Sequence, residues 1–168
     1  SKYEIGEIVV SGKHVNKSYF KDSGELFKLN KIVENNKIWH RTGDAGYFDE
    51  KERLWLVGRN ENIILKNNKK ICSLMIEYIV DYFQEVSKSS LTTNDKNKLI
   101  LFVELEKTIP INKNEKTILK EKIKNKLKHK ITEIDSVFFV KSIPLDNRHK
   151  TKIDYNLLRK KYRRFLNS

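Results

Sequence analysis

The chain is poor in cysteine, proline and glycine, and this scarcity excludes several kinds of protein. Its 168 residues include one Cys, two Pro and six Gly. The single cysteine, Cys72, cannot form an internal disulfide and is typical of a reducing compartment. The few glycines leave no Gly-rich loop that could cradle phosphates. No apolar run approaches the length of a membrane span, and the first residues lack the apolar core of a signal peptide. We therefore expect a soluble, cytoplasmic chain.

Acidic residues are scarce relative to basic ones. The chain has 35 Lys and Arg against 22 Asp and Glu, and from Lys107 onward the ratio is 18 to 6. A clustered basic surface is typical of proteins that bind nucleic acid. Most of these residues, however, are lysines at helix positions that we expect to face solvent, so we favour a solvated basic surface. A non-catalytic basic module that binds nucleic acid or an acidic partner remains the alternative.

Hydropathy patterns predict an α+β fold with a β-rich first part. A central antiparallel sheet of about three strands flanked by helices should follow, because helical and strand periods alternate after residue 61. Residues 21–36 read as a loop with a short helical or extended piece. The remaining expected elements are strands at 5–10, 37–40, 54–57, 63–65, 69–71, 86–92, 99–105 and 137–140, and helices after Ser73, after Asn112 or Asn114, and after Asp154. Asn67-Asn68 should form a hairpin turn with positive φ, and the run 99–103, apolar on both faces, should be a central, covered strand. In the last two helices, positions 119, 123, 127, 131, 157, 158 and 165 should face inward.

Residues 39–59 contain the first chemically suggestive segment. Thr42-Gly43-Asp44 follows a short strand, and Gly43 and Gly46 permit backbone angles closed to other residues. We therefore expect a sharp turn that holds the Asp44 carboxylate outward.

An apolar return strand then delivers Arg59 beside Asp44. A fixed carboxylate and a fixed guanidinium suit a diol such as a ribose, because the carboxylate accepts from both hydroxyl groups and the arginine donates to the same oxygens. The competing interpretation is a surface hairpin with a salt bridge.

The segment resembles the Thr-Gly-Asp…Gly-Arg motif of the adenylate-forming enzymes, which include acyl-CoA synthetases, peptide-synthetase adenylation domains and firefly luciferase. Upstream, Gly6–Gly12 resembles the family's Gly-Glu-Ile-x-x-x-Gly segment. The resemblance implies that Asp44 and Arg59 bind the ribose of ATP or AMP, that Glu61 occupies the hinge position, and that Thr42 and Lys70 are secondary candidates. It also implies two domains, residues 1–60 and a mobile domain 61–168.

A second segment, residues 143–154, resembles the family's C-terminal Pro…Gly-Lys-(Ile or Val)-Asp…Leu motif. Lys152 takes the position of the lysine that serves adenylate formation, and Lys150 competes with it. Arg148 and His149 match a spacing found in fatty-acid ligase-like and β-lactone synthetase-like members. Without the resemblance, this segment would be read as a solvated basic loop.

The resemblance implies the C-terminal piece of a ligase that uses ATP and Mg²⁺ to activate a carboxylate and passes it to a thiol, such as coenzyme A or a carrier protein. The phosphate loop, adenine-contacting segment and acyl pocket of the family are not in the sequence, so we expect the chain alone to be inactive and to need its N-terminal portion. No metal site is expected in the chain itself, because no histidine has partners at metal-ligand spacing. Ser18, Asn68, Met75 and Thr151 depart from the family pattern, which leaves a degenerate synthetase scaffold as a further alternative.

Overall fold

The computed structural model describes residues 2–20, 24–147 and 152–167. The chain divides into two compact units, residues 1–63 and 64–168. Among the described residues, no helix is both long and apolar enough to cross a membrane. Strands and helices occur in both units, and the predicted α+β class is confirmed.

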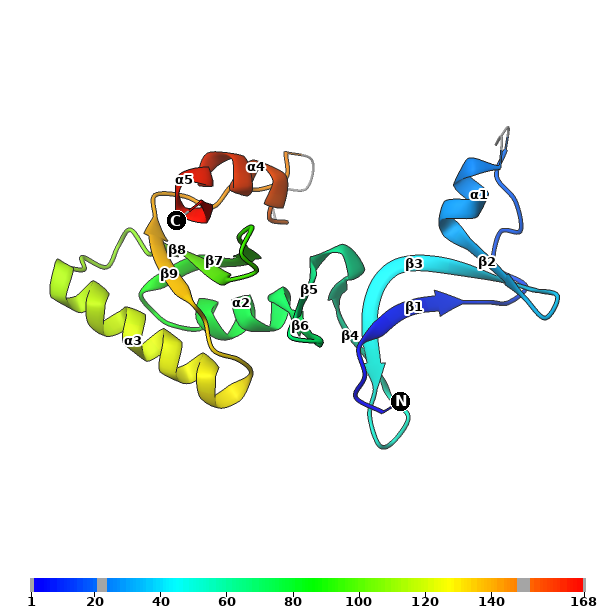
Figure 1. The fold of residues 1–168 in the computed structure, drawn as a ribbon, viewed down its shortest axis with the longest axis horizontal. Helices are drawn as coiled ribbons and strands as arrows, with labels where there is room; N and C mark the ends of the chain where they lie inside the picture. The colour runs from blue at the N-terminus through cyan, green and yellow to red at the C-terminus, as the bar shows by residue number, and fades with distance from the viewer. Residues whose placement is uncertain (1, 21–23, 148–151, 168) are drawn as a thin grey trace. The chain divides into compact units, whose positions relative to one another are not determined.

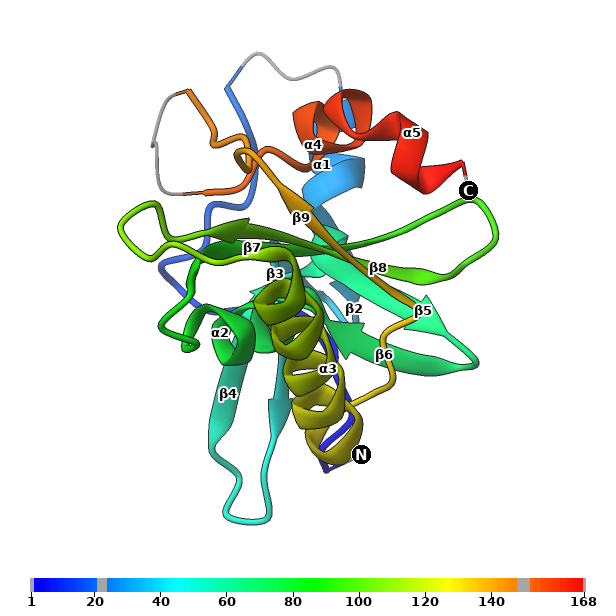
Figure 2. The same ribbon diagram turned by 90° about the vertical axis from the view of Figure 1, so that its left-hand side faces the viewer.

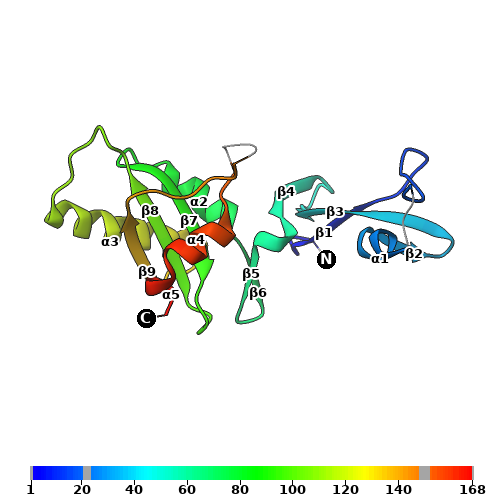
Figure 3. The ribbon, with the colours of Figure 1, turned by 90° about the horizontal axis from the view of Figure 1, so that it is seen from above.

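The first unit is a four-stranded antiparallel sheet built on one long strand, β3 (Lys37–Phe48). Strands β1 (Gly6–Val10), β2 (Lys31–Glu34) and β4 (Leu54–Arg59) all pair with it. The short helix α1 (Glu25–Asn30) precedes β2 and lies beside it (Figure 3). The segment expected to be largely a loop therefore contributes one helix and one strand.

The turn expected at Thr42-Gly43-Asp44 is not formed, because β3 continues through these residues. The strand is instead irregular: its register with β4 shifts between Ala45 and Gly46. Gly46 is close to its neighbours, since a Cβ there would lie 2.7 Å from the carbonyl oxygen of Trp55. Gly43 has a φ of 73°, which other residues rarely adopt. The two glycines thus allow a bulged strand, a role that local sequence does not distinguish from a turn.

The tip between β3 and β4 is held by the buried side chain of Asp49. Its carboxylate accepts hydrogen bonds from the backbone N–H groups of Lys51 and Arg53, from Arg53 Nε and from Trp55 Nε1, at 2.7–2.9 Å. The Trp55 hydrogen bond is the main reason that the pKa of Asp49 lies below its ordinary value. This acid is therefore a structural part of the hairpin.

A 3₁₀ turn, η1 (Asn60–Asn62), follows β4 and leads to a two-stranded hairpin of β5 (Ile63–Lys66) and β6 (Lys69–Cys72). Asn67 and Asn68 connect the two strands with φ values of 50° and 58°. The expected Asn-Asn turn is present, because asparagine tolerates positive φ better than most residues.

The second unit is organised around the sheet β7-β8-β9, formed by Val86–Thr93, Leu99–Leu105 and Ser136–Val140. Strand β8 is central, and residues 99–103 are at most 2% exposed, as expected for a strand covered on both faces. Strand β7 pairs with β8 antiparallel, whereas β9 pairs with β8 in parallel. The sheet is therefore mixed and not entirely antiparallel as predicted, because helix α3 (Lys113–Lys130) carries the chain back across the sheet between β8 and β9.

Helices cover both faces of this sheet, as Figures 1 and 2 show. Helices α2 (Ser73–Asp81) and α3 pack on one face, where Ile76, Ile123 and Leu101 belong to one apolar core. Helices α4 (Tyr155–Lys161) and α5 (Arg163–Leu166) pack on the other face. There Phe102 contacts the ring of Tyr162, with centroids 5.1 Å apart.

Three helix ends differ from the sequence-based expectations. Cys72 rather than Ser73 precedes the first turn of α2, and it makes no side-chain cap. The expected terminal helix is broken at Tyr162 into α4 and α5, and Leu157 is 45% exposed. In α3, the final expected apolar position, Ile131, lies past the helix end and is 38% exposed.

Candidate ribose site and lysine hairpin

Asp44 and Arg59 form an ion pair at the position where β3 and β4 meet. The two residues are direct partners in the strand register, and Arg59 Nη1 lies 2.9 Å from Asp44 Oδ1. Their side chains are 35% and 53% exposed. The second oxygen of Asp44, Oδ2, accepts no hydrogen bond from the described residues. A partly exposed carboxylate with one uncommitted oxygen beside a guanidinium can bind vicinal hydroxyl groups.

Thr42 and Gly43 hold this ion pair in place. The Thr42 hydroxyl donates to the carbonyl oxygen of Ile8 and accepts from the N–H of Asp44. Arg59 Nη1 also donates to the Thr42 carbonyl oxygen at 3.2 Å. A Cβ on Gly43 would lie 3.6 Å from Arg59 Nη1, which is ordinary contact, so the positive φ is what favours glycine here. Thr42 thus positions the pair through its hydroxyl group, which binds the Asp44 N–H, and through its carbonyl oxygen, which binds Arg59.

Lys152 lies in a short hairpin just before α4. Leu145 and Ile153 form an antiparallel bridge, and the Lys152 carbonyl oxygen accepts from the N–H of Asp146 at 2.8 Å. The N–H of Asp154 donates to the carbonyl oxygen of Pro144 at 3.0 Å. The Lys152 side chain is exposed and makes no ion pair with the described residues. The backbone is therefore fixed while the ammonium group is available.

A buried carboxylate anchors the same segment at its other end. Glu77, on α2, is 4% exposed and accepts from the Tyr155 hydroxyl at 3.0 Å and from the N–H of Leu91 at 2.8 Å. Ser73 Oγ lies 3.4 Å from the same hydroxyl. Burial raises the pKa of Glu77 to about 7, and burial also raises the pKa of Tyr155.

Sequence reasoning missed the contact between Glu77 and Tyr155. Tyr155 directly follows the predicted helix cap Asp154, and nothing in the neighbouring sequence indicates that its hydroxyl group contacts a residue far away in the chain. The only available signal was an acid next to the apolar face of α2, because a buried acid needs a hydrogen-bond donor. Tyr155 lies three residues after Lys152, so this contact ties the lysine hairpin to α2.

The remaining candidates are dispersed. Glu61 is exposed in η1, and Lys70 is exposed on β6. Arg148, His149 and Lys150 lie outside the described residues. Thr42, Asp44 and Arg59 are brought together in the first unit, whereas Lys70 and Lys152 belong to separate elements of the second. Within the described part of the chain, no three His, Cys, Asp or Glu residues are grouped so that they could hold a metal ion, and we assign no Mg²⁺ ligand there.

Several curated proteins show detectable sequence similarity to this chain. The 2-succinylbenzoate–CoA ligase of Oceanobacillus iheyensis is 30% identical over 115 residues, which cover 67% of this chain and 23% of that protein. The olefin β-lactone synthetase of Xanthomonas campestris is 30% identical over 111 residues, which cover 61% of this chain and 20% of that protein. The matched part of the chain thus spans between a fifth and a quarter of the length of these relatives. No family model matches the chain.

The fold has a counterpart among solved structures. ATP-bound MatB from Rhodopseudomonas palustris superimposes with a TM-score of 0.71 at 21% identity, over 99% of this chain and 32% of MatB. At this identity the likeness concerns the fold alone. Taken with the sequence similarity to ligases, it shows that the chain belongs to the adenylate-forming enzyme superfamily and represents its C-terminal portion.

Proposed function

We propose that this chain is part of an ATP-dependent ligase that activates a carboxylate as an acyl-adenylate and then passes the acyl group to a thiol, such as that of coenzyme A. The Asp44–Arg59 pair carries this proposal. Its free oxygen and adjoining guanidinium match the hydrogen-bonding needs of a ribose 2′,3′-diol. The relatives named as CoA ligases support the reaction class.

In this proposal each part of the chain has a separate task. Asp44 and Arg59 hold the nucleotide by its ribose. The Lys152 ammonium group stabilises the negative charge that builds up when the carboxylate attacks the α-phosphate, as a positioned cation does at a developing charge. ATP enters with Mg²⁺, which offsets phosphate charge. The N-terminal portion of the ligase supplies the phosphate and acyl contacts, so the chain by itself releases no pyrophosphate.

Glu61 is the proposed pivot between the two half-reactions. It lies in a short 3₁₀ turn, two residues before the last residue of the first compact unit. A segment between regular elements can absorb the changes in φ and ψ that a domain rotation requires. Residues 61–168 would then rotate to present different surfaces in adenylation and in thiol transfer.

The ribose assignment is tested by Asp44→Ala in the full-length ligase. Loss of hydrogen bonds to a charged group costs about 1.5–3 kcal/mol, so kcat/KM for ATP should fall about 10- to 100-fold. Steady-state kinetics with ATP varied at saturating carboxylate measures this change.

Glu50→Ala is the matched control, because Glu50 is an exposed acid on the same hairpin. Asp49 is unsuitable, since its removal would disturb the hairpin itself. Equal losses for Asp44→Ala and Glu50→Ala would refute the ribose assignment.

A further inference from the structure

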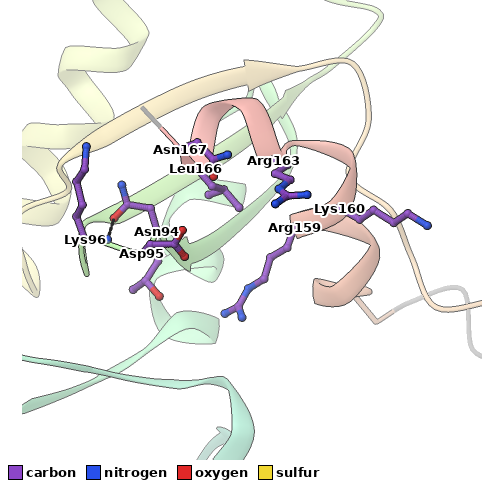
Figure 4. A pocket seen from close by; sticks show the side chains of 9 residues that line it. Asn94, Asp95, Lys96, Arg159, Lys160, Arg163, Leu166 and Asn167 are labelled. Atoms are coloured by element: carbon purple, nitrogen blue, oxygen red, sulfur yellow. Dashed lines mark hydrogen bonds between the residues drawn. The ribbon is translucent and has the colours of Figure 1, made fainter.

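The second unit contains an open cavity that the proposed reaction does not use. It has a volume of about 640 Å³ and lies between the β7–β8 turn and the helices α4 and α5 (Figure 4). This volume is within the usual range of small-molecule sites. None of the residues assigned to the ribose site or to adenylate formation lines it.

The lining of this cavity is strongly cationic. Lys96 comes from the turn, Arg159 and Lys160 from the last turn of α4, and Arg163 from the start of α5. Asp95 is the acid among the lining residues. Among the described residues, no carboxylate forms an ion pair with any of these four cations. The cavity therefore holds an excess positive charge that an anion could neutralise.

The turn that forms one wall is preorganised. Asn94 is 7% exposed, and its Oδ1 accepts from the N–H groups of Lys96 and Lys98 at 3.0 and 2.9 Å. The amide nitrogen of Asn94, Nδ2, is buried and has no hydrogen-bond partner among the described residues. A buried donor without a partner is unfavourable and rare in folded proteins. Because Nδ2 is itself buried, it does not face the open cavity, and the preorganisation of this wall rests on the two Oδ1 contacts.

The helical wall is fixed as well. Arg159 Nε donates to the buried hydroxyl of Thr92 at 3.1 Å, which ties α4 to the end of β7. Tyr162 and Phe165 pack in the apolar core around Phe102. Arg159 and Arg163 consequently start from anchored backbone positions, which lowers the entropic cost of arranging them around a ligand.

We propose that this cavity binds a compact phosphate-containing anion. Four cations without a carboxylate partner among the described residues line it, and guanidinium groups match phosphate oxygens in geometry. Leu166 is the one apolar side chain in the lining, and no aromatic ring is present there to stack on a nucleobase. The lining thus favours the phosphate group over a base as the recognised part.

The test is a titration of the whole chain with inorganic pyrophosphate at low salt. Calorimetry measures the Kd, and NMR chemical shifts of the amides in the β7–β8 turn report where the anion binds. The variant Lys160→Gln/Arg163→Gln removes two exposed cations that form no ion pair with a carboxylate in the described part of the chain. We expect the Kd to rise about fivefold or more, on the scale of about 1 kcal/mol for two partly solvated charges. Asp95→Asn should lower the Kd, because it removes the opposing charge.

The control is Lys122→Gln/Lys126→Gln on the exposed face of α3, which changes the net charge equally. It should leave the Kd within about twofold of the parent value, since distant exposed charges are screened. Titrations with AMP and with a single-stranded oligonucleotide distinguish the source of the phosphate. The proposal would be overturned if the α3 control lost as much affinity for pyrophosphate as the cavity variant. It would also be overturned if the oligonucleotide bound more tightly than pyrophosphate and did so at α3, or if the turn amides did not shift at about 10 mM pyrophosphate. Asp44→Ala should leave pyrophosphate binding unchanged, so the outcome is independent of the ribose assignment.

Discussion

At the scale of single residues, two carboxylates of this chain show how environment sets protonation. Asp49 accepts hydrogen bonds from Trp55 and Arg53, which lower its pKa. Glu77 also accepts hydrogen bonds, but the burial of its charge outweighs them and raises its pKa to about 7. The carboxyl group of Asp49 in the hairpin thus favours its charged form, whereas burial makes the charged form of the Glu77 carboxyl group unfavourable.

The raised pKa of Glu77 predicts a pH-dependent stability. An unfolded glutamic acid has a pKa near 4.5 and the folded one about 7, so between these values the folded chain holds a proton that the unfolded chain releases. The free energy of unfolding should therefore fall as pH rises through this window, by at most about 3 kcal/mol. Glu77→Gln removes this contribution. Chemical denaturation at about pH 5 and about pH 8 compares it with the parent chain.

The exposed acid Glu133 supplies the control for this comparison. Glu133→Gln should keep the pH dependence of the parent chain, whereas Glu77→Gln should reduce it. If the free energy of unfolding changed with pH in the same way for the parent chain and for Glu77→Gln, the pKa of Glu77 would not be raised in the folded chain.

At the scale of elements, the start of α3 shows how a few residues define a helix boundary. Asn112 Oδ1 accepts from the N–H groups of Asn114 and Glu115, and Glu115 Oε2 accepts from the N–H of Asn112. This reciprocal capping box satisfies backbone donors that the first helical turn leaves open. It also decides between the two asparagines that the sequence offered as caps.

We expect Asn112→Ala to lower the free energy of unfolding by about 1 kcal/mol, the usual cost of losing an N-terminal cap. Asn114→Ala is the matched control, because Asn114 contributes only its backbone N–H to the capping box. Denaturant unfolding of both variants measures the difference. A larger loss for Asn114→Ala would contradict the assigned cap.

At the scale of the whole molecule, the chain separates the proposed ribose site from the proposed catalytic lysine. Asp44 and Arg59 belong to the unit of residues 1–63, and Lys152 belongs to the unit of residues 64–168. The covalent link between these units passes through η1 and β5. In our proposal, this division allows one domain to hold the nucleotide while the other rotates and presents a different surface in each half-reaction.

Lys152→Ala in the full-length ligase should slow adenylate formation strongly and leave thiol transfer from a preformed acyl-adenylate largely intact. Glu61→Pro should impair thiol transfer or both steps, because proline fixes φ at the proposed pivot. Pyrophosphate exchange and single-turnover thioester formation measure the two steps separately. The placement of the catalytic lysine would be wrong if Lys152→Ala slowed both steps alike, or if Lys150→Ala were the damaging change.

The sequence by itself determined the features that depend on neighbours within a few positions. The period of Leu119, Ile123 and Leu127 predicted the buried face of α3, and Asn67-Asn68 predicted a turn with positive φ. The apolar run at 99–103 predicted the covered central strand. Asp44 and Arg59 were identified as a pair because a single hairpin joins them.

Only the tertiary structure decided the features that join distant segments. The parallel pairing of β9 follows from the crossover through α3, and Glu77 meets Tyr155 across 78 positions because the folded chain brings the start of α4 next to α2. The cationic cavity likewise combines Lys96 with Arg163. Local patterns select helix, strand and cap, whereas the burial of a polar group depends on which surfaces the folded chain brings together.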